Sequence, residues 1–138
     1  MDKILVDCVV FCYEEDDLKV LLVKQDKGID LAKWGVLSGI VKNANDTDDT
    51  VHGLLKEFNI HSTIIFKEIN CSIFYNMSEA RLRYYALIDS EHYRINFGSD
   101  LPIQRWFKLN DVPDLVHNHN AALDFCLDDL NRSIEKEL

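Results

Sequence analysis

Residues Trp34–Ile60, WGVLSGIVKNANDTDDTVHGLLKEFNI, contain an apolar run, a polar segment and an amphipathic run in immediate succession. The apolar run, Trp34–Val41, is broken only by Ser38 and two glycines, which predicts a short buried strand. The amphipathic run has apolar residues at positions i, i+3, i+4 and i+7, namely Val51, Leu54, Leu55 and Phe58. That spacing places them on one face of a helix of about three turns.

Both ends of this expected helix carry residues that favour helix termini. Asp46 or Thr47 can accept hydrogen bonds from the free amides of the first turn, and the acidic residues that follow favour the positive end of the helix dipole. Asn59, at the other end, tolerates the left-handed backbone conformation that commonly ends a helix. The sequence therefore predicts a strand, a loop and a helix, with Asn59 as the C-terminal cap.

Strand-like runs precede and follow this unit. Ile4–Tyr13 and Leu18–Lys24 are rich in β-branched and aromatic residues, and the acidic segment Glu14–Asp17 between them predicts a hairpin. The later strand candidates are Thr63–Ile69, Cys71–Tyr75, Leu82–Ser90 and Arg105–Leu109. A closing helix is expected from about Ala121. Two helices and several strands predict one α/β (α+β) layered domain over residues 1–138.

The composition is that of a globular domain, because 47% of the 138 residues are hydrophobic and 28% are charged. The net charge is −9, so we expect no nucleic-acid binding by this domain alone. The sequence shows no membrane-spanning run and no signal peptide, so we expect a cytoplasmic protein without a membrane partner. The four cysteines form no CxxC pair and are expected to be reduced, with Cys8 and Cys12 on one strand face.

Trp34–Ile60 resembles a Nudix box, the metal-binding motif of the Nudix superfamily. Gly39 stands at the opening glycine of the box, Leu54 at a hydrophobic position and Glu57 at the last helical glutamate. Val6–Gln25 is similar to the opening hairpin of the Nudix subgroup that includes repressors of sugar and NAD metabolism. The resemblance implies a Nudix-type α/β/α sandwich built around a mixed β-sheet.

The resemblance also implies which residues would hold the divalent cation of the family. In an intact box, glutamates three and four residues apart share one helix face and hold Mg²⁺. Asn45, His52, Gly53 and Lys56 stand here at the first Glu, the Arg and two further Glu positions, which leaves Glu57 as the metal-ligand candidate. We therefore expect no catalytic residues, no required cofactor and weak Mg²⁺ binding at most.

Three residues of a later strand form a candidate ligand-binding face. Arg81, Arg83 and Tyr85 alternate along the chain and therefore point to one side of a strand. Arginines bind phosphate groups, and a neighbouring aromatic ring can stack on a base or a ribose. The alternative is a solvated face paired with carboxylates. Trp34 is a fourth ligand-binding candidate, with a place in the core or a groove wall as its alternative.

Two histidines form an H-x-H pair, His117 and His119. Such a pair is either one edge of a metal site or part of the beginning of the closing helix, and the helix is the favoured interpretation. His119 also agrees with the last residue of a Phe-Asp-His motif in the repressor subgroup. Ser38 has no evident sequence partner that would make it a nucleophile.

Three functions fit these observations. The favoured hypothesis is a catalytically impaired Nudix-fold domain that binds a nucleotide-diphosphate or phosphorylated-sugar ligand as a sensor or binding module. The alternative is an active metal-dependent pyrophosphohydrolase that cleaves a nucleoside diphosphate linked to another moiety. It would use Glu57 with carboxylates recruited from elsewhere, such as Glu68, Glu79 or Asp89. The third is an assembly module without a small-molecule ligand, for which a homodimer is one arrangement.

Overall fold

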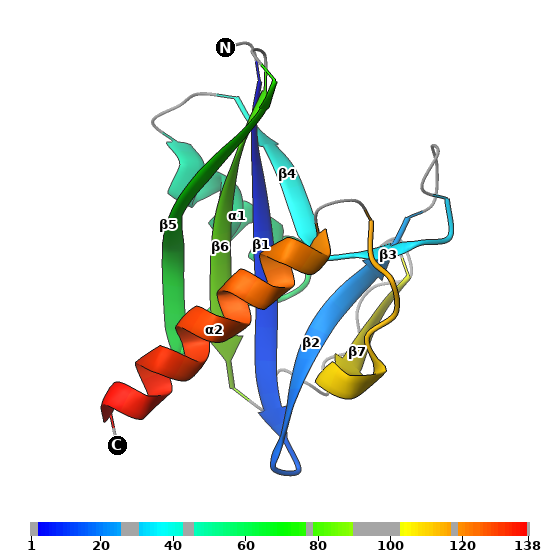
Figure 1. Ribbon diagram of the computed structural model, residues 1–138, viewed down its shortest axis with the longest axis vertical. Coiled ribbons are helices and arrows are strands. Elements are labelled where there is room, and N and C mark those ends of the chain that lie inside the picture. Colours follow the sequence, from blue (N-terminus) through cyan, green and yellow to red (C-terminus); the bar gives the residue numbers. More distant parts are fainter. Residues whose placement is uncertain are drawn as a thin grey trace.

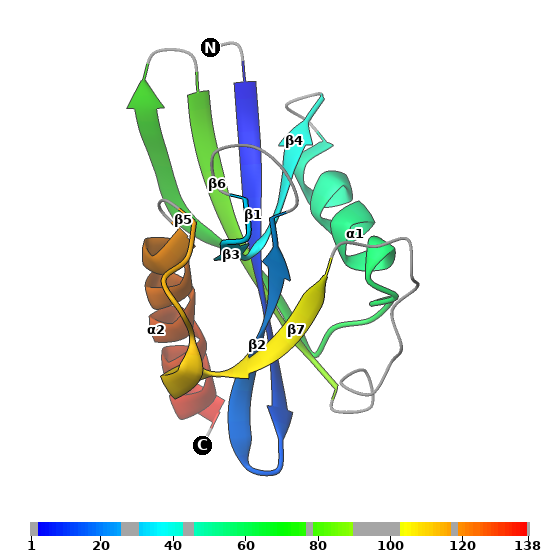
Figure 2. The ribbon, with the colours of Figure 1, turned by 90° about the vertical axis from the view of Figure 1, so that its right-hand side faces the viewer.

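The computed structural model describes residues 3–25, 31–42, 46–76, 79–89, 103–116 and 119–137. These residues form a seven-stranded mixed sheet with one helix packed on each face (Figures 1 and 2). The strands are β1 (Lys3–Glu14), β2 (Asp17–Lys24), β3 (Trp34–Gly35), β4 (Leu37–Val41), β5 (Ile65–Asn76), β6 (Glu79–Ile88) and β7 (Gln104–Lys108). The helices are α1 (Thr47–Glu57) and α2 (His119–Glu137), and a 3-10 turn, η3 (Leu109–Asp111), follows β7.

The sheet forks around its central strand, β1. The strand order is β3-β2-β1-β6-β5, while β4 pairs with β1 and β7 pairs with β2. β1 runs parallel to β6, and the other pairs are antiparallel. Ile4–Cys8 of β1 pair with β4, whereas Phe11–Glu14 pair with β2. The sheet therefore opens between β2 and β4 beyond Cys8, a divergence that is visible in Figure 2.

Side chains of β1 alternate between two buried cores, because successive residues of a strand point to opposite faces. Those that pack with α1 are Val6, Cys8, Val10 and Cys12. Those that pack with α2 are Val9 and Phe11. Cys8 and Cys12 are free thiols on one face, as predicted. Burial raises the pKa of Cys12 to about 11 and also raises the pKa of Cys8, so both thiols stay protonated at neutral pH.

The predicted helix cap at Asn59 is confirmed. Asn59 has a φ of 59°, and its N–H donates to the Lys56 carbonyl at 2.9 Å. The N–H of Ile60 donates to the Leu55 carbonyl at 3.0 Å, which completes a Schellman motif. At the other end of α1, Asp46 occupies the cap position, but its side chain accepts no hydrogen bond from the first-turn amides among the described residues.

Two strand predictions differ from the structure. Trp34–Val41 is two strands rather than one, because β3 pairs with β2 while β4 pairs with β1. Conversely, the runs predicted at Thr63–Ile69 and Cys71–Tyr75 belong to one strand, β5, whose register against β6 shifts between Ile69 and Ile73. Hydrophobic pattern identifies extended segments, but the choice of partner strand is tertiary and decides where one strand ends.

Candidate functional site

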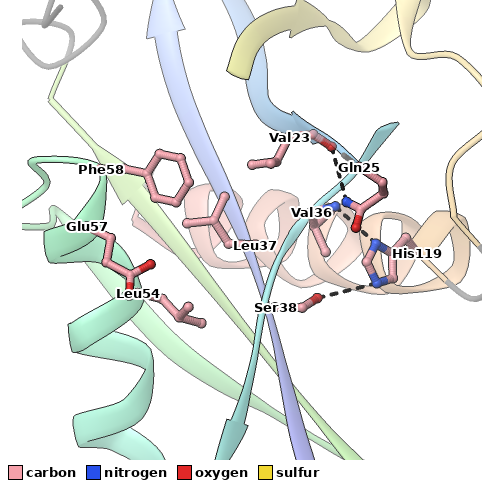
Figure 3. A pocket seen from close by; sticks show the side chains of 9 residues that line it. All are labelled: Val23, Gln25, Val36, Leu37, Ser38, Leu54, Glu57, Phe58 and His119. Atoms are coloured by element: carbon pink, nitrogen blue, oxygen red, sulfur yellow. Dashed lines mark hydrogen bonds between the residues drawn. The ribbon is translucent and has the colours of Figure 1, made fainter. Parts of the chain in front are cut away.

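A pocket of about 200 Å³ lies where β2 and β4 diverge (Figure 3). Four elements bring residues to it: the end of β2, the start of β4, the C-terminal turn of α1 and the first residue of α2. The lining residues are Val23, Gln25, Val36, Leu37, Ser38, Leu54, Glu57, Phe58 and His119. Five of these nine residues are apolar and four are polar, and small-molecule sites commonly combine apolar walls with converging polar groups.

Glu57 is the carboxylate of this pocket. It lies on the last turn of α1 and faces the cavity across from Ser38 and His119 (Figure 3). Gly53, one turn earlier on the helix, is exposed, and Lys56 beside Glu57 carries the opposite charge. In the described part of the chain, no three His, Cys, Asp or Glu residues lie close enough together to hold a metal ion. These residues do not fit the Mg²⁺ site of an intact Nudix box, and Asn45 lies outside the described residues.

His119 closes the opposite side of the pocket. Its Nδ1 accepts a hydrogen bond from the backbone N–H of Val36 at 3.0 Å, in a buried position. Because Nδ1 accepts this bond, the nitrogen that carries a ring proton is Nε2. Nε2 lies 3.5 Å from Asp7 Oδ1 and 3.4 Å from Ser38 Oγ. Gly35 makes room for this ring, since a Cβ at that position would stand 2.7 Å from Nδ1.

Asp7 lies directly behind the pocket and holds its polar wall together. It is only 1% exposed, and Oδ1 accepts hydrogen bonds from Ser38 Oγ at 2.7 Å and from Arg81 Nη1 at 2.8 Å. Burial raises the pKa of Asp7, but the hydrogen-bonding and electrostatic interactions with His119, the hydrogen bond from Ser38 and the charge of Arg81 together outweigh burial. The net effect holds its pKa below the ordinary value, so Asp7 is ionised at neutral pH.

The arrangement of Ser38, His119 and Asp7 differs from that of a catalytic triad. In a triad, the carboxylate binds one imidazole nitrogen and the serine binds the other. Here Asp7 and Ser38 both approach Nε2, and a backbone amide occupies Nδ1. The hydroxyl proton of Ser38 points to Asp7 rather than to an imidazole base. The cluster is therefore built to fix the pocket wall and does not activate Ser38.

The strand face predicted to bind a ligand lies under α2. Arg81, Arg83 and Tyr85 do share one face of β6, and this is the face that α2 covers. Arg81 binds Asp7, and the guanidinium of Arg83 lies 5.1 Å from the ring centre of Phe125 on α2. The Tyr85 hydroxyl donates to Asp129 of α2 at 2.8 Å. Arg83 and Tyr85 are almost fully buried, and none of the three lines the pocket.

Trp34 lies outside the pocket as well. Its ring meets Phe107 edge to face with 5.0 Å between ring centres, and Arg105 lies 5.5 Å from the Trp34 ring centre. Leu115 forms a single backbone bridge with Trp34. Trp34 thus connects β3, β7 and the segment before α2. Of the predicted ligand- and metal-binding residues, only Glu57 lines the described cavity.

The other sequence candidates are scattered. His52, at the Arg position of the box, is exposed and stacks on Phe66 with 4.5 Å between ring centres. Neither Glu68 nor Asp89 lines the pocket. The side chain of Glu79 lies outside the described residues, as does His117.

Sequence reasoning did not assign the polar wall itself: Asp7, Gln25, Ser38 and His119. Two signals were nevertheless present. Asp7 is a single carboxylate inside an otherwise apolar strand, and buried charges normally have partners. His119 matches the final histidine of the Phe-Asp-His motif. It is also the first residue of α2, in agreement with the favoured interpretation that the histidine pair belongs to the beginning of the closing helix.

Comparison with solved structures shows which fold this α/β/α sandwich is. The Nudix domain of NrtR from Shewanella oneidensis, solved with ADP-ribose, is 23% identical and matches 94% of this chain and 89% of that one, with a TM-score of 0.71. The longer NrtR structure is 22% identical and matches 95% of this chain but 64% of its own, with a TM-score of 0.77. A MutT/Nudix family protein from Listeria innocua is 14% identical and matches 96% of both chains, with a TM-score of 0.77. The chain has the Nudix fold, as the sequence resemblance implied.

No model of a known protein family and no curated protein matches the sequence. Among the described residues, none of the helices combines the length and apolar character needed to cross a membrane.

Proposed function

We propose that this chain is a ligand-binding Nudix domain that recognises a sugar-containing nucleoside diphosphate or a phosphorylated sugar and does not cleave it efficiently. One observation carries the proposal. The pocket at the fork of the sheet contains a single described carboxylate, Glu57, where a hydrolase of this fold needs several to hold its cations. A pocket without its metal ligands retains the capacity to bind.

The fold neighbours support the choice of ligand class. The NrtR Nudix domain was solved with ADP-ribose, so a domain of this fold does accept such a molecule. The pocket here is smaller than the roughly 300–1,000 Å³ typical of sites that enclose a whole drug-sized ligand. It therefore encloses one part of the ligand, and the remainder lies outside it.

The scarcity of carboxylates on α1 and around the pocket is the reason to expect slow cleavage. Phosphate-bond hydrolysis in metal-dependent enzymes requires cations that neutralise the diphosphate and activate a water. Glu57 alone supplies one negative charge, and the ammonium of Lys56 on the preceding helical position opposes the approach of a cation. Glu68 and Asp89 do not line the pocket, which removes two of the carboxylates that an alternative metal site would recruit.

Calorimetric titration with ADP-ribose tests the binding part of the proposal. Saturable binding is expected, and Gln25→Trp should abolish it, because an indole at this lining position fills the cavity. Glu135→Trp, at an exposed position of α2, is the matched control and should bind like the wild type. If Gln25→Trp binds ADP-ribose as tightly as the wild type, the ligand occupies another surface.

A further inference from the structure

Most of the polar atoms that face the pocket are hydrogen-bond acceptors. Ser38 donates its hydroxyl proton to Asp7, so the lone pairs of Oγ are what it offers to the cavity. Gln25 donates one N–H of Nε2 to the Val23 carbonyl at 3.4 Å, which leaves its Oε1 and its second N–H available. The Glu57 carboxylate makes no hydrogen bond or ion pair with any residue that the structure describes. All three side chains line the same cavity (Figure 3).

Apart from one N–H of Gln25, the donors near the pocket are already engaged within the protein. The Val36 N–H binds His119 Nδ1, and the proton on His119 Nε2 faces Asp7 and Ser38. The Arg81 guanidinium binds Asp7 behind the wall. Among the described lining residues there is no lysine or arginine. A phosphate needs donors or cations, so this cavity is poorly matched to the phosphate part of a ligand, and the charge of Glu57 repels it.

We propose that the cavity binds the hydroxyls of the terminal sugar of the ligand, with Glu57 and Ser38 as acceptors, and that the phosphates lie outside it. This inference rests on the proposed binding function and assigns the part of the ligand that enters the pocket. The carboxylate of Glu57 can accept hydrogen bonds from two neighbouring hydroxyls at once. The apolar walls of Leu37, Leu54 and Phe58 suit the C–H surfaces of a sugar ring.

ADP-ribose and ADP separate the two assignments, because ADP lacks the terminal ribose and keeps the diphosphate. In Glu57→Gln, the side chain keeps its size, loses its charge and exchanges one acceptor for a donor. Loss of hydrogen bonds to a charged acceptor should weaken ADP-ribose binding about tenfold. ADP should bind unchanged or more tightly, because the charge repulsion is gone. Glu135→Gln makes the same charge change on α2 and should alter neither Kd.

Ser38→Ala provides a second, independent variant on the other side of the cavity. It removes an acceptor without changing charge, so it should weaken ADP-ribose binding severalfold and leave ADP unaffected.

The outcomes of these titrations distinguish failure of the sugar assignment from failure of the proposed binding function. Selective weakening of ADP-ribose by Glu57→Gln and Ser38→Ala supports sugar docking in the cavity. If Glu57→Gln tightens both ligands equally, the phosphates occupy the cavity, and this inference falls while the binding function stands. If neither ADP-ribose nor ADP binds the wild-type chain, the proposed function itself is contradicted.

Discussion

Asp7 shows how one side chain can organise a site from behind. Its carboxylate accepts hydrogen bonds from Ser38 of β4 and Arg81 of β6, and Nε2 of His119, at the start of α2, lies 3.5 Å away. The sequence displays an aspartate inside an apolar strand, but it does not reveal the partners, because Ser38 and Arg81 are 31 and 74 residues away. Residues this distant in sequence meet only through the fold, so the polar wall could not be predicted from local pattern.

Asp7 should make the free energy of unfolding depend on pH. Its pKa is lowered in the folded chain from a usual value of 3.8, so its contribution to stability is present above that value. The contribution is lost as the pH falls below 3.8 through the folded pKa. Asp7→Asn should cost about 3 kcal/mol at pH 7, because it breaks a buried charge pair, and the difference from wild type should shrink in acid. Urea unfolding at several pH values measures this; a pH-independent difference would contradict the assigned charge state.

Two glycines should respond oppositely to the same substitution. In Gly35→Ala the new methyl would stand 2.7 Å from His119 Nδ1, so the ring must move and unfolding should become easier by about 1–3 kcal/mol. In Gly53→Ala the methyl meets nothing within 4 Å on an exposed helix position, and stability should rise by about 1 kcal/mol. Chemical denaturation of both variants checks the pair. Equal effects would mean that His119 does not pack on Gly35.

At the scale of elements, α1 was well specified by its sequence. The apolar spacing predicted the helix, and Asn59 ends it as expected, with Val51 and Leu55 buried against the sheet. The ends and the pairing partners of the short strands were harder to predict from the sequence. Trp34–Val41 divides into β3 and β4 because the two halves join different neighbours, and no local propensity encodes that choice. That division nevertheless positions Val36, Leu37 and Ser38 along the pocket.

The helix register predicts how Mg²⁺ binding could be restored. Positions 53, 56 and 57 lie along one stripe of α1, so Gly53→Glu with Lys56→Glu places two more carboxylates beside Glu57. Saturating Mg²⁺ should then raise the melting temperature by about 5 °C, against about 1 °C or less for the wild-type chain. Gly53→Gln with Lys56→Gln is the uncharged control. A large Mg²⁺ effect on the wild type would contradict the single-carboxylate description.

At the scale of the molecule, the two helices divide the sheet into faces with different tasks. Strand alternation correctly placed Arg81, Arg83 and Tyr85 on one face, but alternation cannot say which helix covers that face. Here α2 covers it, so Arg83 and Tyr85 hold α2 through Phe125 and Asp129. The pocket reaches both layers at the fork of the sheet, where Glu57 of α1 and His119 of α2 face one cavity. The general architecture was predictable from the resemblance to a Nudix box. The cavity could be located only once the pairing of the strands was known.

Turnover of ADP-ribose tests most directly the proposal that this Nudix-fold domain binds its ligand without efficient cleavage. The measurement is chromatographic detection of AMP after incubation with Mg²⁺ or Mn²⁺, for the wild-type chain beside Glu57→Ala. No AMP above the protein-free control is expected for either protein. AMP release by the wild type that Glu57→Ala abolishes would contradict the proposal and would show a metal-dependent hydrolase built around Glu57.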